Sequence, residues 1–159
     1  MKILKKNMYK IKNFGFKILL FLFLSPLIFS QERARVIKVY DGDTIKIILN
    51  KKIEKVRLIG IDCPERDEKG FWQALNFTKR MVMHKNVMIE YDKEKRDKYG
   101  RLLAYVFLED GRFLNEEILR EGHARAILIL PNSKYKERLK KAELEARKNK
   151  KGIWKNIKE

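Results

Sequence analysis

This 159-residue chain is poor in the residue types that cross-link a fold or bind transition metals. Its one cysteine, Cys63, excludes an intramolecular disulfide and argues against a cysteine-based zinc site. Its two histidines, His84 and His123, lie far apart and lack partner motifs, so we expect surface or structural roles for both. No repeat or low-complexity linker is present, and the length suits one domain with its own core, not two.

Acidic residues are scarce relative to basic ones. The chain has 38 lysines and arginines against 21 aspartates and glutamates, a formal net charge of +17. Residues 31–159 alone still carry 32 basic and 21 acidic side chains, because six of the lysines lie in the first 17 residues. Such an excess favours a nucleic acid or an anionic surface as partner. The alternative is a lysine-rich protein whose charge serves solubility alone.

The chain has one long apolar run, residues 18–29, which is shorter than the about 20 residues that span a membrane. Lysines without any acid precede it, Pro26 interrupts it, and the small residue Ser30 follows it. This pattern predicts a secretory signal over residues 1–30 and a secreted or periplasmic domain over residues 31–159. An uncleaved membrane anchor is the alternative, because a bulky residue stands two positions before Ser30.

Two kinds of hydrophobic periodicity follow the leader. Alternating or continuous apolar residues bounded by turn signals predict five strands, at 35–40, 44–49, 56–61, 87–92 and 102–107. Apolar residues at helical spacing predict three helices, at 71–82, at 114–119, and from 131–133 to about Gly152. The pattern by itself predicts an α+β domain with one sheet and three helices. Five strands with a helix between the third and the fourth match an OB-type barrel.

Two aspartates stand where strands begin or end. Asp43 follows a tight turn at the start of the second predicted strand, and Asp62 lies at the end of the third. If those strands pair, the two carboxylates can meet at one end of the sheet. Hard oxygen ligands of this kind suggest Ca²⁺ or Mg²⁺ and not zinc. For the segment Asp41–Thr44 taken alone, a plain surface turn is the alternative.

Two arginines suggest an anionic partner. Arg57 lies in the apolar run 56–59, where water should be scarce, so its guanidinium needs an anion or a cleft. A structural ion pair with an interior acid and a side chain that reaches out to solvent are the alternatives. Arg101 follows Gly100, which permits a tight turn that could direct the arginine side chain.

Three stretches, Asp41–Thr44, Arg57–Glu65 and Asp97–Arg101, together resemble the staphylococcal nuclease (thermonuclease) family. The resemblance extends from about Arg35 to about Trp154. It implies that the sheet closes into a five-stranded OB-type β-barrel. It also implies an endonuclease that hydrolyses phosphodiester bonds of DNA and RNA with little sequence preference and leaves a 3′-phosphate.

The resemblance also assigns roles to individual residues. It implies that Asp43 and Asp62 bind Ca²⁺ together with the backbone carbonyl of Cys63, a ligand that tolerates a change of side chain. It implies that Arg57 and Arg101 grip the scissile phosphate and stabilise charge on its oxygens in the transition state. These assignments describe one phosphodiester-cleaving site.

Further roles follow from the same resemblance. Glu65 matches the proposed general base for the attacking water, and Lys98 and Tyr99 match positions that contact a nucleotide phosphate. The family stacks a base on a tyrosine that residues 126–130 lack, and Leu128 occupies its place, so we expect weaker base stacking. The loop before the first helix is also short. Trp72 and Trp154 are expected to pack in the fold and not to stack on bases.

Two other functions remain open. A catalytically silent nucleic-acid-binding barrel would be expected to have lost the paired acids, the arginines or Glu65, and all of them are present. A membrane-anchored adhesive domain would keep its leader and bind anionic polymers without a metal. We infer no obligate protein partner, and we expect a membrane contact only if the leader is uncleaved. The sequence therefore favours an exported, Ca²⁺-dependent nuclease.

Overall fold

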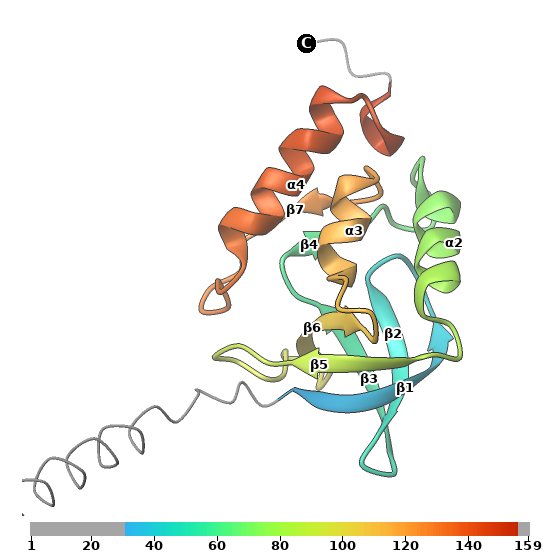
Figure 1. Ribbon diagram of the computed structural model, residues 1–159, viewed down its shortest axis with the longest axis vertical. Helices are drawn as coiled ribbons and strands as arrows, with labels where there is room; N and C mark the ends of the chain where they lie inside the picture. The colour runs from blue at the N-terminus through green and yellow to red at the C-terminus, as the bar shows by residue number, and fades with distance from the viewer. Residues whose placement is uncertain (1–30, 156–159) are drawn as a thin grey trace, which may run out of the picture. The chain divides into compact units, whose positions relative to one another are not determined.

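The structure, a computed structural model, describes residues 31–155 (Figure 1). The predicted signal at residues 1–30 lies outside the described residues, and its cleavage stays a prediction. Five strands form a closed barrel in the order β1-β2-β3-β6-β5. Their bounds are β1 Glu32–Val39, β2 Thr44–Leu49, β3 Lys52–Leu58, β5 Asn86–Glu90 and β6 Leu102–Leu108. Outside the barrel, β4 (Ile61–Asp62) pairs antiparallel with β7 (Arg125–Ala126).

Three α-helices accompany the barrel, and Figure 1 shows them gathered on one side of it, opposite the end of the β2–β3 hairpin. They are α2 Phe71–Val82, α3 Leu114–Arg120 and α4 Lys136–Lys148, followed by the short 3₁₀ helix η1, Gly152–Trp154. The predicted α+β class, with a five-stranded OB-type barrel and three helices, is confirmed. Within residues 31–155, no helix is long and apolar enough to cross a membrane.

The barrel closes because one face of its strands is apolar. In β2, Ile45 and Ile47 are fully buried, whereas Lys46 between them is directed outward. Val56 of β3 and Ile89 of β5 are fully buried as well. Burying one such aliphatic side chain stabilises the fold by roughly 1.5–3 kcal/mol relative to exposing it. The alternation in the sequence thus selects which face of each strand forms the core.

The third strand differs from the prediction, which placed one buried strand over residues 56–61. β3 begins earlier, at Lys52, and ends at Leu58, because the chain turns at Gly60, where φ is +79°. A side chain at Gly60 would also collide with α4, since an added Cβ would lie 2.4 Å from Leu139 Cδ1. The turn places Asp62 on the separate strand β4, beyond the barrel wall.

The third helix is shorter than predicted at both ends. It begins at Lys136 and ends at Lys148, and the chain then reverses direction into η1. Lys150 has a φ of +50°, which stops the helix. Gly152 then lies against Gly122, where an added Cβ would be 2.0 Å from the Gly122 carbonyl oxygen. Close backbone contact at this reversal requires glycine and ends the helix before Gly152.

The two tryptophans have different environments. Trp154 of η1 is buried, as predicted, and the Arg147 guanidinium lies 4.1 Å from its ring centroid. Trp72 of α2 is 60% exposed, so the prediction that it packs in the core was wrong. Its neighbour Phe71 takes the buried position, and the two rings meet in a T-shaped arrangement, with the centroids 5.1 Å apart.

Candidate active site

The turn between β1 and β2 is held against α2 and presents Asp43. The Thr78 hydroxyl of α2 donates a hydrogen bond of 2.7 Å to the Gly42 carbonyl oxygen. Gly42 packs so closely that an added Cβ would lie 2.5 Å from Cys63 Sγ and 2.8 Å from Ala74 Cβ. The Asp-Gly-Asp sequence is therefore a packed element of the fold and not a free surface turn, which was the alternative interpretation.

Asp43 is an almost buried carboxylate, 5% exposed, with several donors around it. Its Oδ2 accepts a 2.7 Å hydrogen bond from the Cys63 amide, and its Oδ1 accepts one of 3.2 Å from the Thr44 hydroxyl. Burial raises the pKa of Asp43 to about 7, although the Arg57 guanidinium and the Cys63 amide favour the ionised form. A further cation beside this carboxylate would also favour ionisation.

Arg57 brings the two predicted metal-binding acids together. Its Nη1 lies 2.8 Å from Asp43 Oδ1, and its Nη2 donates a 2.9 Å hydrogen bond to Asp62 Oδ1. Nη1 also donates to the Ile61 carbonyl oxygen at 2.9 Å. One guanidinium thus bridges Asp43 and Asp62, although Asp62 lies on the separate strand β4 and not at the end of the third barrel strand. Arg57 forms the ion pair that was one interpretation of its place in the apolar run.

The charges of this cluster suit a hard cation. Two carboxylates share one guanidinium, so one negative charge stays uncompensated when both Asp43 and Asp62 are ionised. Oxygen donors with residual negative charge are what Ca²⁺ and Mg²⁺ prefer. In the part of the chain that the structure describes, no three side chains of His, Cys, Asp or Glu form a metal-binding group. A cation here therefore needs backbone and water oxygens in addition to the two carboxylates.

A second turn directs Arg101 toward the same region. Asp97 Oδ1 accepts hydrogen bonds from the amides of Tyr99 at 3.0 Å and Arg101 at 2.9 Å. Asp97 Oδ2 accepts a 2.6 Å hydrogen bond from Arg101 Nε. Gly100, with a φ of +78°, permits this tight turn, as the sequence indicated. The Arg101 Nε is thus engaged in the turn, whereas within residues 31–155 its two terminal NH₂ groups form no hydrogen bond or ion pair.

A hollow of about 460 Å³ contains most of the predicted site. It is lined by five of the predicted residues, namely Arg57, Asp62, Lys98, Tyr99 and Arg101. The Tyr99 ring is 72% exposed, with Lys98 Nζ 5.1 Å and Arg101 Cζ 5.5 Å from its centroid. Strand β3, strand β4 and the turn at 97–101 therefore line one concave surface, which carries the basic Arg57, Lys98 and Arg101 and the acidic Asp62, Glu94 and Asp97.

Glu65 is not part of that lining. It is exposed in the loop after β4, where its amide donates a 2.9 Å hydrogen bond to Glu68 Oε2. Its carbonyl oxygen accepts a 2.8 Å hydrogen bond from the Glu68 amide. Within residues 31–155, the Glu65 carboxylate accepts no hydrogen bond. The loop geometry is thus defined by the backbone, and the Glu65 carboxylate faces solvent.

Cys63 and Leu128 are placed differently from one another. Cys63 is buried, and burial raises the pKa of its thiol well above the usual value, so the thiol stays neutral and inert. This is consistent with a role for its backbone and not for its sulfur.

Leu128 is exposed but does not line the hollow, whereas Ile127 and Ile129 do. The assignment of the stacking position to Leu128 stays a prediction.

Asp97 is the functional candidate to which the sequence interpretation gave no role. Its contribution is indirect, because it orients Arg101 and closes the turn around Tyr99. A signal was present in the sequence, since an acid four residues before Arg101 within a glycine-containing turn can reach back to the guanidinium. Asp41 was named in the predicted turn without a role of its own, and its Oδ1 accepts a 3.1 Å hydrogen bond from the Asp43 amide.

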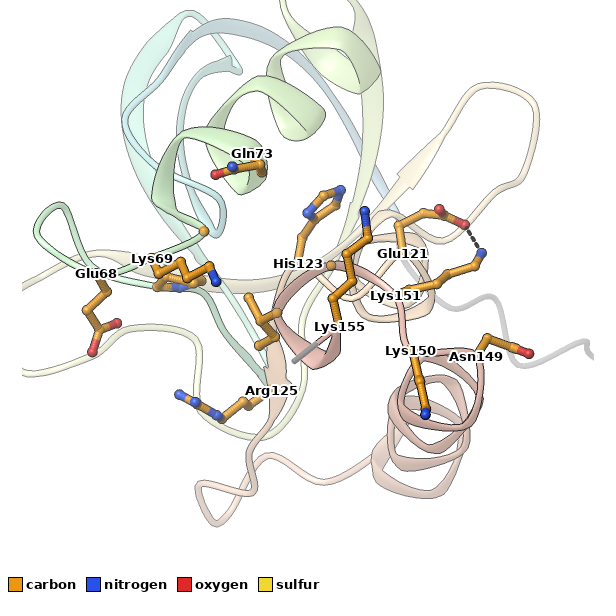
Figure 2. A pocket seen from close by; sticks show the side chains of 14 residues that line it. Glu68, Lys69, Gln73, Glu121, His123, Arg125, Asn149, Lys150, Lys151 and Lys155 are labelled. Atoms are coloured by element: carbon orange, nitrogen blue, oxygen red, sulfur yellow. Dashed lines mark hydrogen bonds and ion pairs between the residues drawn. The ribbon is translucent and has the colours of Figure 1, made fainter. Parts of the chain in front are cut away.

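A larger hollow of about 810 Å³ has a different lining (Figure 2). It is formed by the loop before α2 and the segment after α4, with Lys69, Arg125 and Lys150 among its residues. Figure 2 shows Lys151 paired with Glu121, with 2.7 Å between Nζ and Oε1. This hollow contains none of the acids and arginines that the sequence singled out. The smaller hollow is lined by Arg57, Arg101 and Asp62, and Arg57 connects it to Asp43, so it is the candidate active site.

Comparison with known proteins gives consistent matches. Residues 55–156 match the protein family described as "Staphylococcal nuclease homologue". The chain is 42% identical over 133 residues to "Thermonuclease" of Staphylococcus hyicus, covering 80% of this chain and 78% of that protein. It is 44% identical over 123 residues to "Thermonuclease" of Staphylococcus intermedius, covering 74% and 73%. It is also 39% identical over 125 residues to "Endonuclease YncB" of Bacillus subtilis (strain 168), covering 74% and 59%.

Proposed function

Because the chain belongs to the staphylococcal nuclease family, we propose that it is an exported, Ca²⁺-dependent nuclease that hydrolyses phosphodiester bonds of DNA and RNA. The observation that carries the proposal is the Arg57 guanidinium, held 2.8 Å from Asp43 and 2.9 Å from Asp62 at the edge of a hollow lined by Arg101. Paired acids can hold a cation and paired arginines can bind a phosphate, and both groups stabilise the charge that develops in phosphodiester cleavage.

The residues present fit a calcium ion. Asp43 and Asp62 would hold it with the backbone carbonyl of Cys63, and the bound ion would neutralise charge on the phosphate. Mg²⁺ is a poorer match, because it requires near-ideal octahedral geometry and gives up its water reluctantly. Oxygen ligands from a buried strand end and from a separate short strand form an irregular site, which favours the larger and more adaptable ion.

The two arginines bind the phosphate from different supports. Arg57 extends from β3, and its guanidinium carries two NH₂ groups that already contact acids, so a phosphate must compete for them. Arg101 is held through Nε by Asp97, and it lines the hollow. A guanidinium matches phosphate oxygens in bidentate geometry, and its donors strengthen as charge builds on those oxygens. Lys98 adds positive charge at the same edge.

Glu65 is the proposed general base. An exposed carboxylate that accepts no hydrogen bond within residues 31–155 is available to accept a proton from a water molecule. The loop that carries Glu65 begins directly after β4, so the glutamate follows the acid Asp62 by three residues. In this role Glu65 orients and deprotonates the water that attacks phosphorus, and the arginines stabilise the charge that results.

Little sequence preference is expected. The hollow is lined by basic and acidic side chains, an asparagine, an exposed tyrosine and aliphatic side chains. Its arginines and lysine suit a phosphate backbone, which carries no sequence information. Tyr99 offers one exposed ring on which a base of any identity can stack. The enzyme should therefore cut single-stranded DNA, duplex DNA and RNA at many positions.

The decisive experiment is digestion of plasmid DNA, single-stranded DNA and RNA by residues 31–159, with Ca²⁺ and with EGTA. We expect cleavage with Ca²⁺ and none with EGTA. The Arg101→Ala protein is the matched control for a contaminating nuclease. Tight DNA binding without cleavage in Ca²⁺ would favour the alternative, a catalytically silent nucleic-acid-binding barrel, and cleavage that persists in EGTA would exclude the calcium mechanism.

A further inference from the structure

Three lysines surround one tyrosine on the outer face of the barrel, beside the candidate active site. The Nζ atoms of Lys38, Lys46 and Lys55 lie 4.7, 5.9 and 4.6 Å from the centre of the Tyr40 ring. The three lysines come from β1, β2 and β3, and we call them the lysine row. The face of an aromatic ring attracts cations, but one ring cannot neutralise three of them.

The strand register sets these charges directly against one another. Lys38 lies opposite Lys46 in the β1–β2 pairing, and Lys46 lies opposite Lys55 in the β2–β3 pairing. Like charges directly opposite on neighbouring strands destabilise a sheet. Within residues 31–155, none of the three lysines forms an ion pair or hydrogen bond with an acid. The nearby acid Glu54 is engaged by Arg96.

The lysine row continues the surface that carries Arg57. The next pair along β2 and β3 toward the active site is Thr44 opposite Arg57. Side chains two positions apart on a strand share one face, so Lys46 follows Thr44 and Lys55 follows Arg57 on that face. Two residues of strand span about 7 Å, which is of the order of the separation between successive phosphates in an extended nucleic acid strand.

We propose that the lysine row binds the phosphates of the nucleic acid strand that flank the scissile phosphate, and so selects polynucleotides over short fragments. The proposal rests on the proposed nuclease function. The repulsion between these ammonium groups destabilises the sheet. Such an arrangement is expected where a ligand, and not the fold, supplies the negative charge that balances them. Lysine is suited to a phosphate backbone because its ammonium is a point charge on a flexible stem, which follows the backbone without reading bases.

The test compares two triple variants of the full chain that lose equal charge. One removes the lysine row, Lys38→Gln/Lys46→Gln/Lys55→Gln. The other removes three exposed lysines of α4, Lys140→Gln/Lys141→Gln/Lys148→Gln. Binding of a 20-nucleotide single strand is measured by fluorescence anisotropy in EGTA, with the strand checked by gel to be intact. This assay needs no catalysis, so its result is independent of whether the chain is a nuclease.

Loss of the lysine row should weaken binding at least tenfold at 0.1 M salt. It should also reduce the slope of log K against log salt by about 2, because each phosphate contact on a single strand contributes about 0.7. The α4 variant should change both quantities much less. Equal losses in the two variants would overturn the proposal, because net charge would then explain them, and so would wild-type binding by the lysine-row variant.

Catalysis provides a second readout. With Ca²⁺, the lysine-row variant should show a KM for long single-stranded DNA raised about tenfold, with kcat within about twofold of wild type. Turnover of a dinucleotide substrate, too short to reach the row, should be unchanged. An equal loss on the dinucleotide would show that the row acts on the active site itself, and the proposal would be wrong.

A single substitution separates binding from folding. Lys46→Glu places a carboxylate between Lys38 and Lys55, which converts two repulsive cross-strand pairs into attractive ones. The melting temperature at low salt should rise, while affinity for the 20-nucleotide strand should fall. Opposite changes in stability and affinity are not expected of a residue with a purely structural role. A lower melting temperature, or unchanged affinity in a folded protein, would contradict the proposal.

Discussion

Replacing Asp97 with asparagine should impair catalysis while leaving the turn at residues 97–101 folded. Asp97 Oδ1 accepts hydrogen bonds from the amides of Tyr99 and Arg101, and an asparagine oxygen can accept both. Asp97 Oδ2 accepts from Arg101 Nε at 2.6 Å, and the NH₂ group that replaces it cannot accept. Asp97→Asn therefore removes one charge-assisted hydrogen bond and keeps the backbone bonds.

The size of the effect follows from that one bond. A hydrogen bond to a charged group contributes about 1.5–3 kcal/mol. The side chains of Arg101 and Asp97 are 27% and 15% exposed, so solvent screening favours the lower part of this range. Since 1.4 kcal/mol corresponds to a factor of ten, kcat/KM should fall roughly 10- to 30-fold.

The pH dependence gives a second signature. Burial raises the pKa of Asp97, but the hydrogen bonds from the Arg101 side chain and amide lower it by more, so the net shift is downward. The ionised form holds Arg101, and a carboxyl whose folded pKa is lowered contributes stability above the unfolded pKa. That contribution is lost as pH falls through the folded pKa. Wild type should therefore lose activity and stability as pH falls through the folded pKa of Asp97. The Asp97→Asn protein should lack this component of the pH dependence, because asparagine does not titrate.

The assay is kcat/KM on single-stranded DNA for wild type, Asp97→Asn, Arg101→Ala and the double variant. If Asp97 acts through Arg101, the double variant should be no slower than Arg101→Ala alone, because the two substitutions remove one interaction. Wild-type kcat/KM in a folded Asp97→Asn protein would refute the reasoning. Fully additive losses would show that Asp97 acts on the substrate by another route.

Four further outcomes are expected. Ca²⁺ should support cleavage, EGTA should abolish it and Mg²⁺ should support it poorly, as measured by digestion of single-stranded DNA; full activity in EGTA would exclude the metal site. Arg57→Ala and Glu65→Gln should each lower kcat about 10²-fold or more, and wild-type turnover by folded Glu65→Gln would make Glu65 a bystander. N-terminal sequencing of protein recovered from medium or periplasm should begin near Gln31, whereas a membrane-bound chain that keeps its leader would indicate an anchor. Ile129→Tyr should tighten binding of a short single-stranded oligonucleotide in EGTA, because a base stacked on an aromatic ring contributes roughly 1–3 kcal/mol. Leu128→Tyr should tighten this binding less. A larger gain for Leu128→Tyr would show that Leu128 faces the nucleic acid.

Local patterns in the sequence predicted the elements that depend on local physics. The helix at residues 71–82 was predicted with its observed bounds, because its apolar residues recur at helical spacing and bury one stripe. The alternation of Ile45 and Ile47 with polar neighbours likewise identified β2. The prediction of one strand over residues 56–61 was wrong, because a continuous apolar run does not show that the chain turns at Gly60 to pack on α4.

The candidate site was predicted in its residue types but not in its contacts. Asp43 was recognised because it follows a turn, Asp62 because it lies at the end of a predicted strand, and Arg57 because it is a charge in an apolar run. The structure joins the three side chains in one ion-pair cluster. Asp97 and Ile129 were missed as candidates for the site. Their roles depend on which way a turn directs a side chain and on which residues of a loop line a hollow.

By itself, the sequence of this protein determined the periodicity of its strands and helices, the basic excess, and the order of the acidic and basic motifs. These are properties of neighbouring residues, and short-range sterics and hydrophobic patterning encode them. The tertiary structure alone decided that Lys38, Lys46 and Lys55 meet around Tyr40, because strand register is set by barrel closure. It also decided that one guanidinium spans Asp43 and Asp62, because that contact requires the turn before β2, the end of β3 and the strand β4 to lie together.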